Sequence, residues 1–277
     1  MFPATVLALV AAALHAGWNL IAKTSDDREL ALVGQFSIGG ALSAAALCIV
    51  GLPGQAALPW IVASACVHVL YVMGLIWAYD HGDFSFAYPL ARGGGALVAA
   101  LGGVVLLDDH VSAATWSAIG VIAAGLAALV GTRPSRRSLF SAMLTAATIG
   151  TYTVIDSHGA RVAASGQSYG FALLAAVGLT VGFLGLARGR IADLGASLRA
   201  AAWRYLFAGA SGVAAYTLVL VAVRHASVGY VSMLRESSVV LAALAGWLLL
   251  HEHMGSRRLA CSAVILLGLV GLVAANA

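Results

Sequence analysis

Residues 92–131 read RGGGALVAALGGVVLLDDHVSAATWSAIGVIAAGLAALVG, and residues 235–274, which lie 143 positions further along the chain, read RESSVVLAALAGWLLLHEHMGSRRLACSAVILLGLVGLVA. Aligned without gaps, the two stretches are identical at 14 of 40 positions. Ala, Leu and Val match readily by chance, but the alignment also pairs Arg92 with Arg235 and His110 with His253. The sequence therefore predicts an internal repeat, with a first unit over residues 1–132 and a second over residues 133–277.

The whole chain is as apolar as the repeated stretch. Of its 277 residues, 61% are hydrophobic and only 9% are charged, whereas an ordinary soluble domain carries roughly a quarter charged residues. Such a chain needs lipid as the solvent for much of its surface, so we expect bundled transmembrane helices. The net charge of +4 does not indicate a nucleic-acid partner, because the basic residues are scattered through short connecting segments.

Ten apolar runs are each long enough to cross a bilayer, which takes about 20 helical residues. A charged link with a proline, residues 132–137, separates the first five runs from the last five. Because five is odd, the second unit must enter the membrane in the opposite sense. The expected fold is an all-α polytopic membrane protein with ten transmembrane helices in two inverted five-helix repeats. The runs lie near residues 4–22, 30–50, 59–79, 85–107, 112–131, 138–157, 168–187, 201–222, 228–250 and 257–275.

The basic residues also predict the orientation in the membrane. If the N-terminus lies outside the cytoplasm, eleven Lys and Arg residues fall in or beside cytoplasmic segments, and only Arg161 and Arg224 fall in external ones. Cytoplasmic loops of membrane proteins carry an excess of Lys and Arg. We therefore expect a multi-pass protein of the inner (plasma) membrane with both termini on the non-cytoplasmic side.

Several short segments resemble the ten-helix EamA-type branch of the drug/metabolite transporter superfamily. They are HAGWN at 15–19, YPLARG at 88–93, DDH at 108–110 and HEH at 251–253. The resemblance covers essentially the whole chain, and its motifs specify architecture better than cargo. It implies a secondary transporter, monomeric or homodimeric, which often exports amino acids or related metabolites through a central cavity between the halves. It implies no cofactor and no nucleotide.

Polar side chains inside the apolar runs are the candidates for a cargo site, because they are costly in lipid and normally face a cavity or a partner. His15 and Asn19 lie four residues apart on one helical face, with Trp18 beside them. Tyr88 and Arg92 have the same spacing, and so do Tyr152 and Asp156. The candidate cargo-binding residues are His15, Trp18, Asn19, Tyr88, Arg92, Tyr152 and Arg235.

The two repeated arginines are expected on opposite sides of the membrane midplane, because the repeat inverts them. We hypothesise that Arg92, together with Tyr88, Trp18 and Asn19, lines the inner half of a central cavity. The outer half would be lined by Arg235, Glu236, Asp156 and Tyr152. Since arginine recognises carboxylates through two parallel hydrogen bonds, an anionic or zwitterionic cargo is expected.

Two carboxylates, Asp156 and Glu236, could exchange a proton during transport, because burial and neighbouring charges shift a carboxyl pKa in opposite directions. The alternative is that Asp156, Glu236 and Arg235 pair with one another, staple the helices and never touch cargo. A second open choice concerns Pro89 and Gly93, which would either make a gating hinge or allow close helix packing.

Other functions are less well supported. His251 and His253 lie two residues apart, whereas a zinc-protease helix needs its histidines four apart, so we expect no metal site. An intramembrane enzyme would need a catalytic geometry that no spacing in the chain fixes. A flippase for a lipid-linked substrate and a non-transporting membrane partner subunit remain as alternatives.

Overall fold

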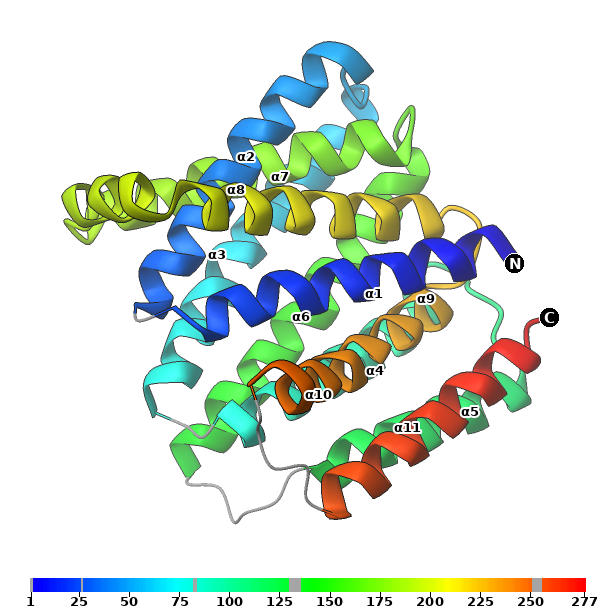
Figure 1. Ribbon diagram of the computed structural model, residues 1–277. Coiled ribbons are helices and arrows are strands. Elements are labelled where there is room, and N and C mark those ends of the chain that lie inside the picture. The colour runs from blue at the N-terminus through cyan, green and yellow to red at the C-terminus, as the bar shows by residue number, and fades with distance from the viewer. Residues whose placement is uncertain (1, 26, 82–83, 130–135, 251–255) are drawn as a thin grey trace.

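The computed structural model of the protein describes residues 2–25, 27–81, 84–129, 136–250 and 256–277. The regular elements in these ranges are eleven α-helices and one short 3₁₀-helix (Figure 1). They are α1 (Phe2–Lys23), α2 (Arg28–Val50), η1 (Gln55–Ala57), α3 (Leu58–His81), α4 (Phe84–Leu106), α5 (Ala113–Leu129), α6 (Arg136–Val162), α7 (Gly166–Ala187), α8 (Ile191–Ala222), α9 (Val228–Arg235), α10 (Ser237–Leu250) and α11 (Ser256–Ala274).

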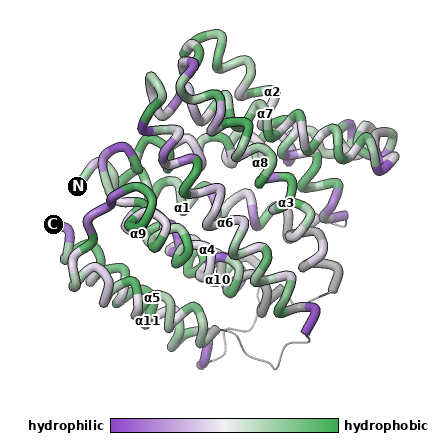
Figure 2. Tube along the Cα trace, turned by 180° about the vertical axis from the view of Figure 1, so that it is seen from behind, coloured by the Kyte–Doolittle hydropathy of each residue, from purple (hydrophilic) through white to green (hydrophobic). Residues whose placement is uncertain are grey.

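The prediction of an all-helical membrane protein is confirmed. Six segments are long and apolar enough to span a bilayer, and they lie at Phe2–Ile21, Glu29–Val50, Gln55–Gly74, Leu139–Val162, Gly166–Ala187 and Ala192–Ala222. Three shorter apolar helices lie at Leu90–Leu106, Ala113–Ala128 and Leu259–Ala274. Strongly hydrophilic positions lie mostly near the helix ends, as expected for helices surrounded by lipid (Figure 2). The count of ten spans remains a prediction.

Two predicted spans differ from the helices that form. The run at 228–250 is divided into α9 and α10 at Glu236, where the backbone stays in the right-handed α region (φ −69°, ψ −11°) but the Glu236 N–H bonds the Met233 carbonyl oxygen, three residues earlier, at 3.0 Å. The run at 201–222 is the second part of a longer helix, α8, which bends at Ala201 (φ −140°, ψ 40°). Residues 191–200 of α8 therefore form an arm that extends beyond the rest of the bundle (Figure 1).

The helices pack in matched pairs. Helix α1 packs against α8, and α6 packs against α3; α1 also contacts α9 and α10, and α6 contacts α4. In the same way α2 contacts α8, and α7 contacts α3. Two further pairs join helices at corresponding places in the two predicted units, α2 with α7 and α5 with α11 (Figure 1).

Glycines allow the closest of these approaches. A Cβ on Gly125 of α5 would lie 2.7 Å from Ile265 Cγ1 of α11, and a Cβ on Gly268 of α11 would lie 2.6 Å from Ile122 Cγ1 of α5. The two contacts are reciprocal, and each partner lies 143 positions from its counterpart. Only glycine fits at either position without moving the facing isoleucine.

Candidate functional site

A central cavity lies between α1, α2, α3, α6, α7, α8 and α9. Its volume is about 70 Å³, which is the space of a few water molecules. Its wall is mainly aromatic and small apolar, with one cationic side chain. The side chains that give it its chemistry are those of His15, Trp18, Gln35, His68, Tyr71, Tyr152, Tyr216 and Arg235.

The cation is Arg235, the last residue of α9, and its side chain is buried in the bundle. Its guanidinium carbon lies 5.6 Å from the centroid of the Tyr216 ring, at cation–π distance. Within the described ranges, no carboxylate forms an ion pair with Arg235. A buried guanidinium without an anionic partner is costly. The cavity is therefore a place where an anion would be stabilised.

The adjacent Glu236 pairs with the other repeated arginine. Arg92 Nη2 donates to Glu236 Oε1 at 2.8 Å, and both side chains are buried. The pair joins α4 to the break between α9 and α10, so it links the two predicted units. The second oxygen, Glu236 Oε2, is buried and accepts no hydrogen bond from the described residues.

Asp156 of α6 lies behind the wall of the cavity and is almost completely buried. The Tyr169 hydroxyl donates to Asp156 Oδ1 at 3.0 Å, and the Tyr216 hydroxyl donates to Asp156 Oδ2. The Ser64 side chain of α3 lies close to the same carboxyl group. Asp156 is thus held by hydroxyl groups of α7 and α8, while the ring of Tyr216 faces the cavity.

His68 lies between Ser64 and the cavity. His68 Nδ1 lies 3.1 Å from Ser64 Oγ and 3.0 Å from the Ser64 carbonyl oxygen. The imidazole ring stacks on Tyr152 with 4.1 Å between centroids. On α1, the rings of His15 and Trp18 meet edge to face at 4.8 Å.

The structure brings four of the predicted cargo-binding residues to one cavity: His15, Trp18, Tyr152 and Arg235. Asn19 instead donates to the carbonyl oxygen of His15 one turn earlier. The side chain of Tyr88 lies outside the described residues. Trp18, assigned to the inner half, lines the same cavity as Tyr152 and Arg235, which were assigned to the outer half, and the division into halves stays a prediction.

The alternative arrangement, in which Arg235, Glu236 and Asp156 pair with one another, is not seen among the described residues. Glu236 is bonded to Arg92, and Asp156 is bonded to hydroxyl groups. Arg235, next to Glu236 in the sequence, instead lies over the ring of Tyr216. Arg92, expected to line the cavity, is instead engaged in this ion pair beside it.

Helix α4 is continuous through Pro89 and Gly93. A Cβ on Gly93 would lie 2.9 Å from Leu126 Cδ1 of α5, so close packing at this glycine is what the structure displays. The side chain of Pro89 lies outside the described residues, and the hinge stays a prediction. The unit boundary at 132/133 and the segment 251–253 also lie outside them.

The predicted site residues did not include four that line the cavity: Gln35, His68, Tyr71 and Tyr216. One sequence signal could have found His68, because Ser64, His68 and Tyr71 share a face of α3 by their spacing of four and three. Tyr216 has no such signal, since its partner Asp156 lies 60 residues away in the sequence.

A second cavity, of about 260 Å³, lies between α1, α2 and α8. Gln35 and Ala208 line both cavities. Its outer wall includes Asp27 and Arg204, near the helix ends opposite the chain termini. The central cavity therefore has a neighbouring vestibule toward that end of the bundle.

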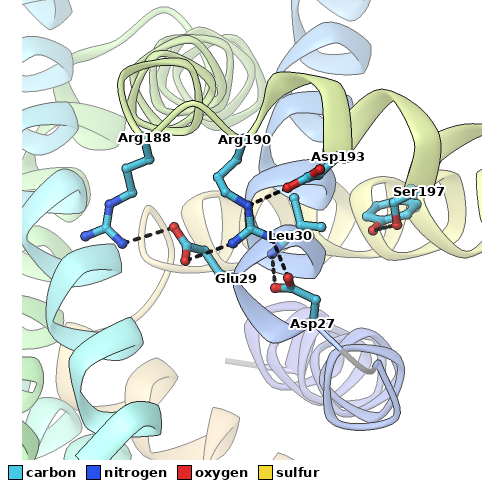
Figure 3. Close-up of polar contacts among 8 residues, drawn as sticks. Asp27, Glu29, Leu30, Arg188, Arg190, Asp193 and Ser197 are labelled. Atoms are coloured by element: carbon cyan, nitrogen blue, oxygen red, sulfur yellow. Dashed lines mark hydrogen bonds and ion pairs between the residues drawn. The ribbon is translucent and has the colours of Figure 1, made fainter.

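The vestibule lies beside an ionic network that joins the α1–α2 link to the α7–α8 link (Figure 3). Arg188 Nη1 pairs with Glu29 Oε1 at 3.0 Å, and Arg190 pairs with Asp27, Glu29 and Asp193. Partial burial alone would raise the pKa of Asp27, but the Leu30 backbone N–H and the Arg190 guanidinium outweigh it. The pKa of Asp27 therefore lies below its ordinary value.

The opposite end, where both chain termini lie, has its own inter-unit bridge (Figure 1). Asp109 Oδ1 pairs with Arg161 Nη2 at 2.8 Å, and Asp109 Oδ2 accepts the backbone N–H of Val228 at 2.6 Å. Asp108, which precedes it, has φ +54°. The bridge joins the α4–α5 link to the end of α6 and the start of α9.

Comparison with known proteins gives the family. The family model described as "EamA-like transporter family" matches residues 136–274, half of the chain. No curated protein matches. A solved structure described only as "Crystal structure of protein" superposes with a TM-score of 0.75 and 18% identity, over 99% of each chain, which is a likeness of fold. The chain belongs to the EamA-like transporter family and is a multi-span membrane protein of the drug/metabolite transporter type.

Proposed function

We propose that the protein is a secondary transporter that moves a small carboxylate-bearing metabolite, such as an amino acid, by alternating access. The observation that carries the proposal is Arg235, a cation in the central cavity with no carboxylate partner among the described residues. The two nearby carboxylates are engaged elsewhere, Glu236 by Arg92 and Asp156 by hydroxyl groups. The anion that complements Arg235 is then the cargo.

The rest of the wall suits a zwitterion of this kind. Aromatic faces of Trp18, Tyr71 and Tyr152 surround the cavity and can hold an ammonium group or an apolar side chain. Gln35 supplies both a donor and an acceptor. In its present state the cavity is smaller than such a cargo, so binding requires the surrounding helices to separate.

Two inverted five-helix units, residues 1–132 and 133–277, supply that movement in our proposal. The matched helix pairs and the reciprocal contacts of Gly125 and Gly268 are what a two-fold relation between the units would give. Exchange of the two conformations between the units opens the cavity to alternate sides. The Asp109–Arg161 bridge would close one end, and the vestibule beside Asp27 would serve the other.

The proposed orientation places the network of Asp27, Glu29, Arg188 and Arg190 in the cytoplasm and both termini outside. Most basic residues of the connecting segments then face the cytoplasm, as the positive-inside rule expects. We further propose that the cargo leaves the cell, which is a common direction for transporters of this type. Ion pairing of Arg92 with Glu236 would keep α9 and α10 broken beside the site.

The test is counterflow in proteoliposomes loaded with individual unlabelled L-amino acids and exposed to the same amino acid in radiolabelled form. We expect uptake of at least one amino acid, and its loss in Arg235→Gln. In Arg235→Lys the charge remains but the two-pronged geometry does not, so at least a tenfold weaker apparent affinity is expected. Arg137→Gln changes an exposed arginine at the start of α6 and is the matched control.

Full activity of Arg235→Gln at normal abundance would remove this residue from the cargo site. A wild-type protein that moves no amino acid, organic acid or related metabolite would refute the proposed function. Chemical conversion of a substrate by the purified protein would favour the enzyme alternative.

A further inference from the structure

Asp156 is a buried carboxylate that does not line the proposed cargo cavity. It lies on α6, outside the cavity wall, and only 1% of its surface is exposed. Within the described ranges no arginine, lysine or histidine pairs with it; its hydrogen-bond partners are the hydroxyl groups of Tyr169 and Tyr216, and Ser64 lies close by. An acidic group at this depth in a membrane protein normally has a counter-ion or a proton.

Hydroxyl partners suit both protonation states. A hydroxyl group donates to a carboxylate, and its oxygen can also accept the O–H of a carboxylic acid. The carboxyl group can therefore gain or lose one proton without leaving a buried polar atom unpaired. An arginine partner could not do this, because guanidinium nitrogens only donate.

Two contacts connect Asp156 with the cavity. Tyr216 has its hydroxyl on Asp156 and its ring in the cavity wall, under the Arg235 guanidinium. Ser64 lies close to Asp156 on one side and 3.1 Å from Nδ1 of the cavity residue His68 on the other. These contacts bring the carboxylate within reach of a proton from cavity water.

We propose that Asp156 binds a proton that travels with the cargo, and that Tyr216 connects this proton site to Arg235. The inference rests on the proposed function, since it takes Arg235 to hold the carboxylate of the cargo. One proton passes from cavity water to an oxygen of Asp156 when cargo binds. The same proton is released when cargo leaves on the other side, and no covalent bond in the cargo changes.

The direction of coupling follows from the charges. The free Arg235 cation favours the ionised form of Asp156, and a cargo carboxylate on Arg235 cancels that effect. Cargo binding therefore favours protonation, so that cargo and proton cross in the same direction. Efflux of accumulated cargo would carry protons out of the cell, the reverse of proton-driven antiport.

The polar, titratable and charged groups around Asp156 come from several helices. Helix α3 presents Ser64 and His68, and α6 itself presents Tyr152 one turn away. Arg92 of α4 is engaged by Glu236. Tyr169 of α7 and Tyr216 of α8 bond the carboxyl group, and Arg235 of α9 lies beyond it, over the ring of Tyr216.

A first experiment needs no cargo. The full-length protein in lipid nanodiscs is titrated with acid and followed by infrared spectroscopy at the carbonyl stretch of protonated carboxyl groups. We expect a buried carboxylic acid band that is absent in Asp156→Asn, present in Glu236→Gln, and shifted in frequency in Tyr169→Phe, which removes one hydroxyl donor away from the cavity. The proposal would be overturned if a folded Asp156→Asn protein kept the wild-type carboxylic acid band, or if the wild type showed no such band at any pH.

A second experiment follows protons and cargo together. Proteoliposomes loaded with a mixture of radiolabelled L-amino acids are diluted into weakly buffered medium that contains a pH dye. We expect efflux to acidify the medium, and the number of protons per cargo molecule to fall to near zero in Asp156→Asn. In Tyr216→Phe we expect an intermediate ratio, because the link to Arg235 is cut while Ser64 remains.

The outcomes separate the two proposals. If the wild type moves label without protons, or if Asp156→Asn keeps the wild-type ratio, the proton site is refuted while the transporter stands. If the wild type moves no amino acid at all, the proposed cargo fails, and the infrared titration alone decides whether Asp156 takes up a proton.

Discussion

At the scale of residues, the buried pair of Arg92 and Glu236 is the contact that most distinguishes this bundle from a set of apolar helices. Removing one partner of a buried ion pair leaves the other charge uncompensated, which typically costs about 3–5 kcal/mol. We expect Arg92→Gln to lower the thermal unfolding midpoint of the detergent-solubilised protein strongly. The double variant Arg92→Gln/Glu236→Gln should recover much of the loss, because two amides replace the two charges.

The double variant also separates two roles of Arg92. If it folds and still exchanges cargo, Arg92 serves by holding Glu236. If it folds and exchange is lost, Arg92 contacts cargo as the sequence analysis proposed. A double variant no more stable than Arg92→Gln would contradict the pairing seen in the structure.

A pH dependence is expected at Asp27, which begins α2 and pairs with Arg190. Its pKa is lowered in the folded protein, so its ion pair stabilises the fold above the ordinary pKa of about 3.9 and is lost as the pH falls through the lowered value. Asp27→Asn keeps an oxygen that can accept the Leu30 N–H but removes the charge. We expect it to reduce stability by at most about 1 kcal/mol at neutral pH.

The measurement is the difference in unfolding midpoint between wild type and Asp27→Asn across pH 3 to 8, a window set by that ordinary value of about 3.9. The difference should begin to shrink as the pH falls below about 4, the ordinary pKa, and should disappear only below the lowered pKa, where the wild-type carboxylate is protonated in the folded protein as well. Asp193→Asn, which changes a more exposed partner of Arg190, is the matched control. A difference that persists undiminished in acid would mean that the effect is not that of the charge.

At the scale of helices, the contact of α5 with α11 makes a prediction that depends on its reciprocity. Gly125→Ala places a methyl group against Ile265, and Gly268→Ala places one against Ile122. We expect the two variants to lose similar amounts of stability. Each loss should be relieved by Ile→Ala at the facing position, with a coupling energy within the usual range of about 0.5–3 kcal/mol.

The control is the crossed combination. Gly125→Ala together with Ile122→Ala changes two residues that do not face each other across the contact, so their effects should add. Thermal unfolding of the four single and three double variants gives all the coupling energies. Equal coupling in matched and crossed pairs would contradict the packing described.

The helices themselves were largely predictable, whereas their interruptions were not. Hydropathy located most helices to within about five residues, because a span must be apolar over its whole length, but it missed the first ten residues of α8. The break at Glu236 escaped prediction, since glutamate favours helices and neither proline nor glycine lies nearby. The pairing of Glu236 with Arg92, 144 residues away, is a tertiary contact that accompanies the break and cannot be seen in a local pattern.

The site residues were predictable within single helices, but their partners on other helices were not. Residues that share a helical face in the sequence, such as His15 and Trp18, were found together in the cavity. The partners that cross between helices were not foreseen, as Tyr216 and Asp156 show. Polar spacing within one helix therefore identifies candidates, but the pairing of charges is decided by the packed bundle.

At the scale of the whole molecule, the two ends of the bundle are held by different contacts. The bridge of Asp109 with Arg161 and the Val228 N–H ties the units together at the end that carries the termini. We expect Asp109→Asn to weaken this end and to raise the share of molecules open there. A loss of about 1 kcal/mol would raise that share about fivefold.

The share can be measured by labelling a cavity cysteine. Ala215→Cys lines the central cavity and is introduced after the three native cysteines are replaced by serine. A membrane-impermeant thiol reagent added from the side of the termini should label it faster in Asp109→Asn than in the parent protein. Asp193→Asn at the other end should leave that rate unchanged or lower it.

The reciprocal contact of α5 with α11 has one more consequence. Because Gly125 meets Ile265 as Gly268 meets Ile122, the contact is isologous: one surface patch meets a second copy of itself, as in a symmetric homodimer. On the proposed two-fold relation, a single five-helix unit already carries both halves of this interface. Such a unit could assemble with itself only if its copies were inserted in opposite directions. Tandem fusion of the two copies makes that antiparallel pairing permanent and leaves each half free to diverge, as the different partners of Arg92 and Arg235 display.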